Sequence, residues 1–134
     1  MPTQRLTELP DAVLRLISLI VRMLDLAGIR EGHKVLEIGT GTGYSTAILY
    51  HRLGDKNVYS IENDPALAAA AADHIHAAGY TPALITGDGL AGHKDAADYD
   101  AIVATCAVRY IPPAWLYQVR DEGTSPPRLL TLLP

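Results

Sequence analysis

Three glycines at alternate positions, between a predicted strand and a predicted helix, constrain this chain more than any other feature. Residues 39–43 read Gly-Thr-Gly-Thr-Gly, after the apolar stretch 34–38 and at the start of the helix-forming stretch 43–53. Glycines at this spacing allow a tight turn and let a ligand approach the backbone. The N-terminus of the following helix offers N–H groups that have no helical partner. The sequence therefore predicts a strand–turn–helix unit that binds a ligand.

The rest of the chain continues the alternation of strands and helices. We predict helices over residues 11–27, 43–53, 66–78 and 113–119, and strands over 34–38, 58–61, 83–86, 100–105 and 128–133. Strands that alternate with helices form βαβ units and a mainly parallel sheet. The prediction is a doubly wound, Rossmann-like α/β fold with about five strands, whose loops after the strands meet at one edge.

Composition bounds the domain organisation and the partners. With 134 residues, 49% of them hydrophobic, the chain is expected to form a single domain over residues 1–134. Within it we expect an N-terminal helix (11–27), a cofactor-binding core (33–120) and an atypical C-terminal tail (121–134). The net charge of −4 argues against nucleic acid as a partner held by a basic field.

Further patterns exclude a membrane span and a metal site. The apolar stretch 12–29 is interrupted by three charged residues, Arg15, Arg22 and Asp25. Such charges argue against a membrane segment, and with no targeting signal we expect a cytoplasmic protein. The single cysteine, Cys106, excludes an internal disulfide and a cysteine-based zinc site. His74 and His76 point in two directions on one helix, so no metal site is predicted.

Acidic residues stand at the ends of the predicted strands. Glu37 precedes the glycine turn, Glu62 ends the second strand, and Asp88 follows the third. At the mouth of the turn, the Glu37 carboxylate would repel phosphate and attract an amino group. Glu62 can accept two hydrogen bonds from a ribose diol, and Asp88 can accept one from an exocyclic amine such as that of adenine. Tyr44 stands where a dinucleotide-binding loop has its third glycine, which argues against a pyrophosphate ligand.

These demands together describe a ligand with an adenine, a ribose diol and a cationic amino-acid tail, but no phosphate. S-adenosylmethionine meets all of them, so we predict it as the cofactor, with S-adenosylhomocysteine as its product. The alternative for the motif is a tight strand-to-helix turn with chance acids at the strand ends.

Several segments resemble the class I S-adenosylmethionine-dependent methyltransferases. They are Leu36–Tyr44, Val58–Glu62, Gly87–Gly89, Asp100–Thr105 and Ile111–Pro113. The chain is most similar to the protein-L-isoaspartate O-methyltransferase family, and residues 104–116 look like its bacterial relatives that methylate aspartate in ribosomally made peptides. The resemblance implies an enzyme that transfers a methyl group to an isoaspartyl or aspartyl carboxylate of a protein or peptide.

The resemblance also implies roles for individual residues. Glu37 and the glycine turn would hold the methionine part of the cofactor, and Glu62 the ribose. Asn63 would lie against the adenine, and Asp88 with Gly89 would contact its edge. Thr105 to Val108 would line the floor near the methyl group. The predicted cofactor site comprises Glu37, Gly39, Thr40, Gly41, Gly43, Tyr44, Glu62, Asn63, Asp88, Gly89 and Thr105.

Two segments depart from the family pattern. The family carries a Thr-x-Ser-x-Pro segment that helps to close the active site, and at that place this chain has Val13-Leu-Arg-Leu-Ile17. After the last predicted helix the family has a Pro-Gly-Gly turn and further strands, whereas residues 120–127 read Arg-Asp-Glu-Gly-Thr-Ser-Pro-Pro. Leucines 129, 130, 132 and 133 would then lie on an exposed sheet edge, so we expect a homo-oligomer or a partner subunit that covers it.

The acceptor side of the site is less defined. A carboxylate is a nucleophile at neutral pH, so methyl transfer to it needs alignment and exclusion of water rather than a strong base, and no catalytic residue is assigned. Arg109, with Val108 beside it, can hold a substrate carboxylate or can be a solvated loop arginine.

Three other functions stay open. They are a small-molecule methyltransferase, a non-catalytic remnant that binds the cofactor or a partner, and a nicotinamide-dependent oxidoreductase, which Tyr44 and Glu37 disfavour.

Overall fold

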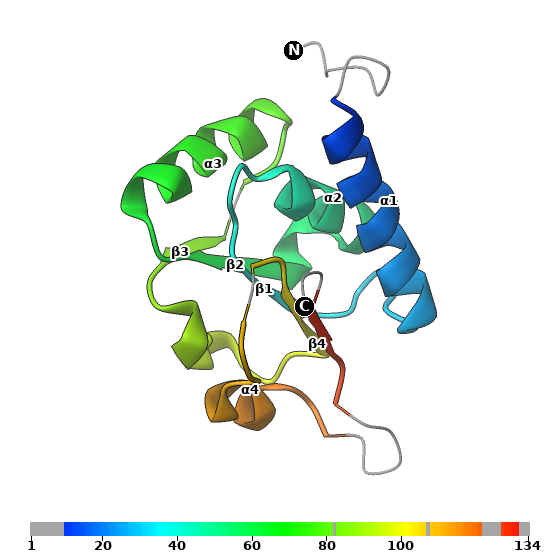
Figure 1. Ribbon diagram of the computed structural model, residues 1–134, viewed down its shortest axis with the longest axis vertical. Coiled ribbons are helices and arrows are strands. Elements are labelled where there is room, and N and C mark those ends of the chain that lie inside the picture. The colour runs from blue at the N-terminus through cyan, green and yellow to red at the C-terminus, as the bar shows by residue number, and fades with distance from the viewer. Residues whose placement is uncertain (1–9, 82, 107, 122–126, 132–134) are drawn as a thin grey trace.

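A parallel sheet of five strands forms the centre of the computed structural model, which describes residues 10–81, 83–106, 108–121 and 127–131 (Figure 1). The strand order is β3–β2–β1–β4–β5, and every neighbouring pair runs parallel. The strands are β1 (Val35–Ile38), β2 (Val58–Glu62), β3 (Leu84–Thr86), β4 (Ala101–Ala104) and β5 (Leu129–Thr131). The predicted α/β class, with its parallel sheet of about five strands, is confirmed.

Helices cover both faces of the sheet. In Figure 1, α1, α2 and α3 lie on one face, and α4 lies on the other together with the short 3-10 helix η3. The helices are α1 (Asp11–Leu26), α2 (Tyr44–Leu53), α3 (Pro65–Ala77) and α4 (Pro113–Gln118), with 3-10 turns η2 (Asp55–Asn57), η3 (Gly89–Ala91) and η4 (Lys94–Ala96). The layered arrangement follows from parallel strands, whose crossover connections place helices on both faces.

Alternate residues of the strands enter two separate hydrophobic cores. Val35 and Val103 face α1 and α2, where they pack with Leu24 and Leu49. The intervening strand residues face α4, whose Trp115 packs among Leu36, Ile38, Ile61 and Ile102. Trp115 thus packs the short helix α4 onto the sheet.

The helix ends follow the sequence signals closely. The Asp64 carboxylate caps α3 by accepting the backbone N–H groups of Ala66 and Leu67, and Pro65 occupies the first turn. Gly54 and Gly79 follow the ends of α2 and α3 with φ of 94° and 96°, a conformation that L side chains rarely adopt.

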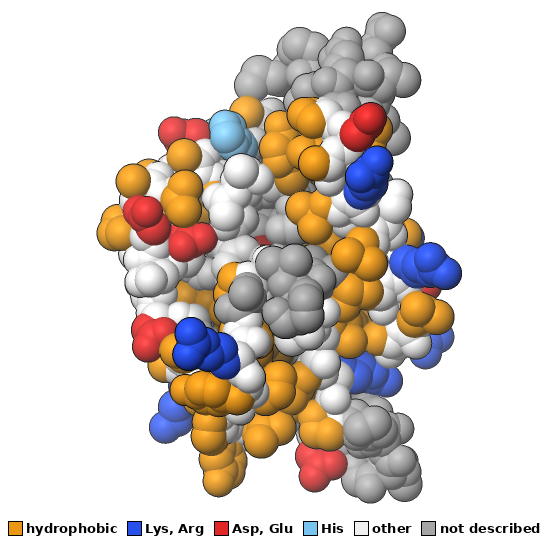
Figure 2. Space-filling model, viewed as in Figure 1, with side chains coloured by type: hydrophobic (Ala, Val, Ile, Leu, Met, Phe, Trp, Pro, Cys, Tyr) orange, Lys and Arg blue, Asp and Glu red, His pale blue; other side chains and the backbone are white. Residues whose placement is uncertain are grey.

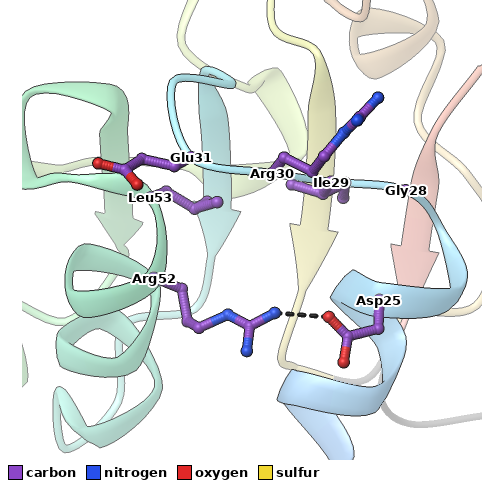
Figure 3. Close-up of a pocket in the computed structure, with 7 residues that line it drawn as sticks. All are labelled: Asp25, Gly28, Ile29, Arg30, Glu31, Arg52 and Leu53. Atoms are coloured by element: carbon purple, nitrogen blue, oxygen red, sulfur yellow. Dashed lines mark hydrogen bonds and ion pairs between the residues drawn. The ribbon is translucent and has the colours of Figure 1, made fainter.

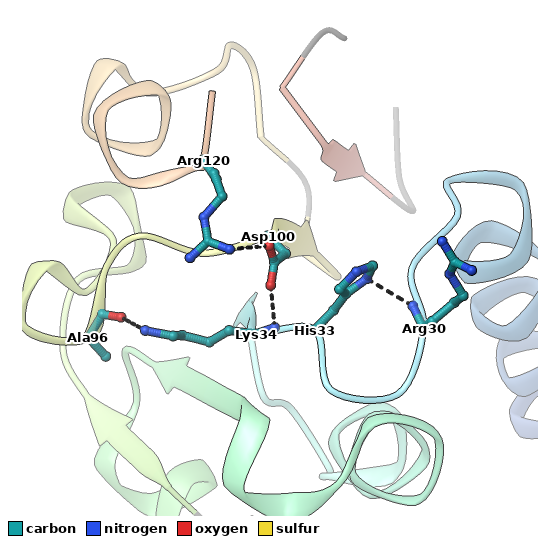
Figure 4. Close-up of polar contacts among 6 residues, drawn as sticks. All are labelled: Arg30, His33, Lys34, Ala96, Asp100 and Arg120. Atoms are coloured by element: carbon teal, nitrogen blue, oxygen red, sulfur yellow. Dashed lines mark hydrogen bonds and ion pairs between the residues drawn. The ribbon is translucent and has the colours of Figure 1, made fainter. Parts of the chain in front are cut away.

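Polar contacts fix the amino ends of β1 and β4, opposite the glycine turn (Figure 4). The backbone N–H of Lys34 donates to Asp100 Oδ2 at 2.8 Å, and Lys34 Nζ donates to the Ala96 carbonyl at 2.5 Å. Arg120 pairs with Asp100 Oδ1 at 2.8 Å. These contacts hold the two central strands in the register that pairs Val35 with Ala101.

The edge strand β5 is better covered than the sequence suggests. Leu129 and Leu130 are half-buried, because Leu129 packs against the α4 core and Leu130 against the α1 and α2 core. The prediction that they lie exposed is therefore wrong in part, while Leu132 and Leu133 fall outside the described residues. Figure 2 shows hydrophobic side chains gathered over α1 and around α4. No helix within the described ranges is long and apolar enough to cross a membrane.

Candidate functional site

The loops after β1, β2, β3 and β4 share the carboxyl edge of the sheet, as parallel pairing requires. Gly39 N–H donates to the Ile61 carbonyl, Thr105 N–H donates to the Ile38 carbonyl, and Gly87 N–H donates to the Glu62 carbonyl. These bonds extend the sheet pairing beyond the strands and bring the four loops together. The structure thus assembles the predicted residues after β1 to β4 along one edge of the sheet.

Each glycine of the turn has a different reason to lack a side chain. All three have positive φ, which is 94° at Gly39, 56° at Gly41 and 87° at Gly43. A Cβ on Gly39 would lie 3.1 Å from Cys106 Cβ, and one on Gly43 would lie 3.3 Å from Ala71 Cβ. A Cβ on Gly41 would meet nothing within 4 Å. Gly39 and Gly43 therefore allow close packing, and Gly41 leaves its backbone open to a ligand.

Glu62 joins the end of β2 to the glycine turn. Its Oε1 accepts the Gly41 backbone N–H at 2.9 Å, and its Oε2 accepts the Asp64 N–H at 3.0 Å. An ionised carboxylate has about four acceptor positions, so each oxygen keeps capacity for a further donor. Glu62 thus presents a fixed and only half-buried carboxylate beside the open backbone of Gly41.

Glu37 does not lie at the mouth of the turn, which corrects the prediction made for it. Its side chain is 0% exposed. It accepts hydrogen bonds from Ser45 at 2.6 Å, from Ser60 at 2.7 Å and from Thr46. Strand β1 is central and covered on both faces, so a residue on its α2 side points into the core. Glu37 supports the turn from below, where it cannot contact a ligand amino group.

Burial raises the pKa of Glu37, and the negative charge of Glu62 adds to this rise. The hydroxyl donors Ser45, Thr46 and Ser60 act in the opposite direction, because they stabilise the charged form. The network continues to the turn, since the Thr40 hydroxyl lies 2.6 Å from that of Ser60. Thr40, predicted to contact the cofactor, is also buried and acts as the link between this network and the glycine turn.

The floor beneath the turn comes from the end of β4 and from α3. The Thr105 hydroxyl donates to the Gly39 carbonyl, and His74 Nδ1 on α3 lies 3.1 Å from the Thr42 carbonyl oxygen. Cys106 is half-buried, and burial raises the pKa of its thiol. The thiol therefore stays protonated at neutral pH, which is typical of a small packing residue and not of a nucleophile.

The segment after β3 is fixed from the opposite helix. Asp88 Oδ1 caps η3 by accepting the Leu90 N–H at 2.9 Å, and the side chain remains exposed. Trp115 Nε1 donates to the Gly89 carbonyl at 2.8 Å. Gly89 itself packs closely, since a Cβ there would lie 2.6 Å from Ile38 Cγ2. Asp88 therefore projects from a well-anchored turn.

The remaining predicted residues lie at the rim of this edge or beyond it. Asn63 and Arg109 are exposed, and Tyr44 and Val108 are half-buried. Ala107 falls outside the described residues. The structure places Asn63 next to Glu62 in the chain and Tyr44 in the first turn of α2, but it assigns neither of them a ligand contact.

A cavity of about 460 Å³ lies elsewhere, between the C-terminal ends of α1 and α2 (Figure 3). Ile29 and Leu53 form its apolar part, and Arg52 reaches across it to Asp25 at 2.5 Å. The cavity shares none of its lining residues with the loops after the strands. Among the residues that the structure describes, no cluster of His, Cys, Asp or Glu could hold a metal ion.

Sequence reasoning missed the supporting residues. One group surrounds the buried Glu37 carboxylate with hydroxyl donors, which are those of Ser45, Thr46 and Ser60. A second group, Trp115 and Gln118, anchors η3. The signal for the first group was present, because small hydroxyl residues at a helix start and inside a buried strand are suited to serve a buried carboxylate. No comparable signal marked Gln118.

A family model, curated relatives and a solved structure identify the family of the chain. The family model for protein-L-isoaspartate(D-aspartate) O-methyltransferase matches residues 11–125. The chain is 38% identical over 122 residues to the protein-L-isoaspartate O-methyltransferase of Ignicoccus hospitalis, covering 87% of this chain and 58% of that one. It is 42% identical over 106 residues to that of Koribacter versatilis, covering 78% and 47%. A solved protein-L-isoaspartate O-methyltransferase superposes with a TM-score of 0.76 at 30% identity, covering 87% of this chain and 36% of that one. The chain spans about half the length of the curated relatives it matches.

Proposed function

Because the chain belongs to the protein-L-isoaspartate(D-aspartate) O-methyltransferase family, we propose that it transfers a methyl group from S-adenosylmethionine to a carboxylate oxygen of a protein or peptide. The observation that carries the proposal is the pairing of Gly41 with Glu62. An open glycine backbone at φ 56° stands beside a carboxylate that is held in place at the end of the neighbouring strand.

The residues at this edge suit each part of the proposed cofactor. The backbone of Gly41 is open enough for a close approach by the amino-acid tail. Glu62 has acceptor capacity for a ribose diol, and the exposed carboxylate of Asp88 can accept from the amino group of adenine. The glycine turn, residues 39–43, contains no lysine or arginine, which is consistent with a ligand that lacks phosphate.

The bound cofactor would supply a methyl group on a sulfonium, ready for in-line displacement by a carboxylate oxygen. The protein would contribute orientation and exclusion of water rather than a base, because a carboxylate is already a nucleophile at neutral pH. Thr105 and Val108 would line the floor on the acceptor side. Arg109, which is exposed on the segment after β4, would hold the acceptor carboxylate by charge-assisted hydrogen bonds.

We propose that acceptors include aspartyl peptides as well as isoaspartyl proteins, since residues 104–116 resemble the peptide-modifying relatives. We also propose a cytoplasmic enzyme, with which the free thiol of Cys106 is consistent. Val13–Ile17 forms a regular part of α1, and this favours an acceptor site built differently from that implied by the family's Thr-x-Ser-x-Pro segment.

Calorimetric titration with S-adenosylhomocysteine tests the cofactor assignment. We expect micromolar binding by the wild-type chain and none by Glu62→Ala. Glu62→Gln, which keeps one acceptor oxygen, should weaken binding by about tenfold or more, because hydrogen bonds to charged groups are worth about 1.5–3 kcal/mol. Titration with NAD serves as the control for a dinucleotide site. Binding of NAD by the folded wild type would overturn the assignment. So would a Glu62→Ala variant that binds S-adenosylhomocysteine as tightly as the wild type does.

A further inference from the structure

Two buried side chains of α4 hold the segment between Gly89 and His93 at three points. Trp115 Nε1 donates to the Gly89 carbonyl at 2.8 Å. The Gln118 amide makes the other two bonds: its Nε2 donates to the Ala91 carbonyl at 3.0 Å, and its Oε1 accepts the His93 N–H at 2.8 Å. Trp115 is 1% exposed and Gln118 is 6% exposed, so water does not compete for these bonds.

The backbone of the segment is shaped around the Gln118 amide. Gly92 has φ 63°, and a Cβ there would lie 2.2 Å from Gln118 Oε1. The Gln118 side chain therefore rests directly against the backbone, where only glycine leaves room. Trp115 and Gln118 are three residues apart and share the inner face of α4, whereas Leu116 and Tyr117 are exposed on its outer face.

These contacts determine where Asp88 points. Asp88 is the residue before η3, and its Oδ1 is committed to the Leu90 N–H. Oδ2 makes no hydrogen bond within the described residues, so it can accept from a ligand. Because Oδ1 is tied to η3, the direction of Oδ2 changes whenever η3 shifts. Trp115 and Gln118 hold the carbonyls of Gly89 and Ala91, which are two of the three residues of η3.

We propose that Trp115 and Gln118 are positioning residues that give the site its preference for adenine over other purines. The inference rests on the proposed cofactor. By fixing η3, the two side chains keep the Asp88 carboxylate aimed at the amino group of the base. They do not touch the cofactor themselves. Their removal affects recognition of the amino group more than the binding of the rest of the nucleoside.

A pair of ligands isolates this effect. S-inosylhomocysteine carries a carbonyl oxygen in place of the amino group and a hydrogen on N1, so a carboxylate aimed at the position of the amino group faces a carbonyl oxygen and disfavours this ligand. The affinity ratio of the two ligands, measured by calorimetry, is expected to be at least about tenfold in the wild type. Asp88→Asn removes the carboxylate, so it gives the affinity ratio expected when the amino group is no longer recognised. Trp115→Phe and Gln118→Met should each lower the wild-type ratio by about threefold or more, with a small change in affinity for S-inosylhomocysteine.

Two controls distinguish an effect on the position of Asp88 from a general loss of structure in the variants. Leu116→Ala, on the outer face of α4, should leave the ratio unchanged. Without ligand, hydrogen exchange of the His93 amide should be faster in Gln118→Met, because its buried acceptor is gone, while amides in β1 keep their protection. An unchanged ratio in folded Trp115→Phe and Gln118→Met would overturn the inference. If the wild type binds neither ligand, the proposed cofactor itself is wrong, and this is seen before any variant is made.

Discussion

At the residue scale, Glu37 shows how one buried carboxylate organises the turn. It lies in β1 on the side of α2 and receives the hydroxyl hydrogens of Ser45, Thr46 and Ser60. Removing a partner from such a network leaves a buried polar group unsatisfied, which costs about 1–3 kcal/mol. The geometry of the glycine turn therefore depends on a side chain that is fully buried.

Glu37 should also make stability depend on pH. Its folded-state pKa is raised above 4.5, so the folded state binds more protons than the unfolded state between these two values. The stability it contributes is fully present below pH 4.5 and is lost as the pH rises through the folded-state pKa. Urea unfolding from pH 4 to pH 8 should show that the wild type loses stability relative to Glu37→Gln as pH increases.

Glu31→Gln is the matched control, because it makes the same charge change on an exposed loop. If the wild type instead gained stability relative to Glu37→Gln as the pH rises, the raised pKa of the buried Glu37 carboxyl would be wrong.

At the element scale, the glycine turn separates packing from ligand access. Gly39→Ala places a methyl group 3.1 Å from Cys106 Cβ at φ 94°, so it should lower the free energy of unfolding by about 1–3 kcal/mol. Gly41→Ala has open space and φ 56°, which alanine adopts at a cost of about 1–2 kcal/mol. Yet the methyl group of Gly41→Ala occupies the space proposed for the ligand, so its S-adenosylhomocysteine affinity should fall by about tenfold or more.

Urea unfolding and calorimetry on the two variants measure the two effects separately. A Gly41→Ala variant that binds S-adenosylhomocysteine as well as the wild type would remove Gly41 from the proposed site.

The elements were predictable because each carries its own local signals. Asp64 and Pro65 mark the start of α3, and Gly79 marks its end, so the backbone followed from the sequence with few errors. The face of the sheet on which a strand residue lies was harder to predict, as Glu37 shows, because it depends on which helices cover the sheet. The contact between Gln118 and His93 joins residues 25 apart through a buried amide, and no local pattern encodes it.

At the scale of the whole molecule, β5 is an edge strand among those described, and apolar side chains remain exposed on the helices (Figure 2). Leu26 on α1 is 81% exposed and Tyr117 on α4 is 85% exposed. Unpaired strand edges and apolar surface favour association. We predict that light scattering shows a mass above that of one chain at high concentration. Thr131→Lys, a charge on the exposed edge, should lower the associated fraction.

A folded monomer across the whole concentration range would refute the predicted association. Thr81→Lys makes the same substitution at an exposed position outside the strands and controls for the added charge.

The most direct measurement of the central claim is methyl transfer, followed by mass spectrometry of peptides that contain isoaspartate, aspartate or neither acid. With S-adenosylmethionine, the acidic peptides should gain one methyl group as an ester and the neutral peptide none. Arg109→Ala should raise the KM for the peptide by about tenfold while leaving S-adenosylhomocysteine affinity unchanged, because a charge-assisted pair to the acceptor is lost. A folded protein that binds S-adenosylhomocysteine yet esterifies none of these peptides would contradict the claim.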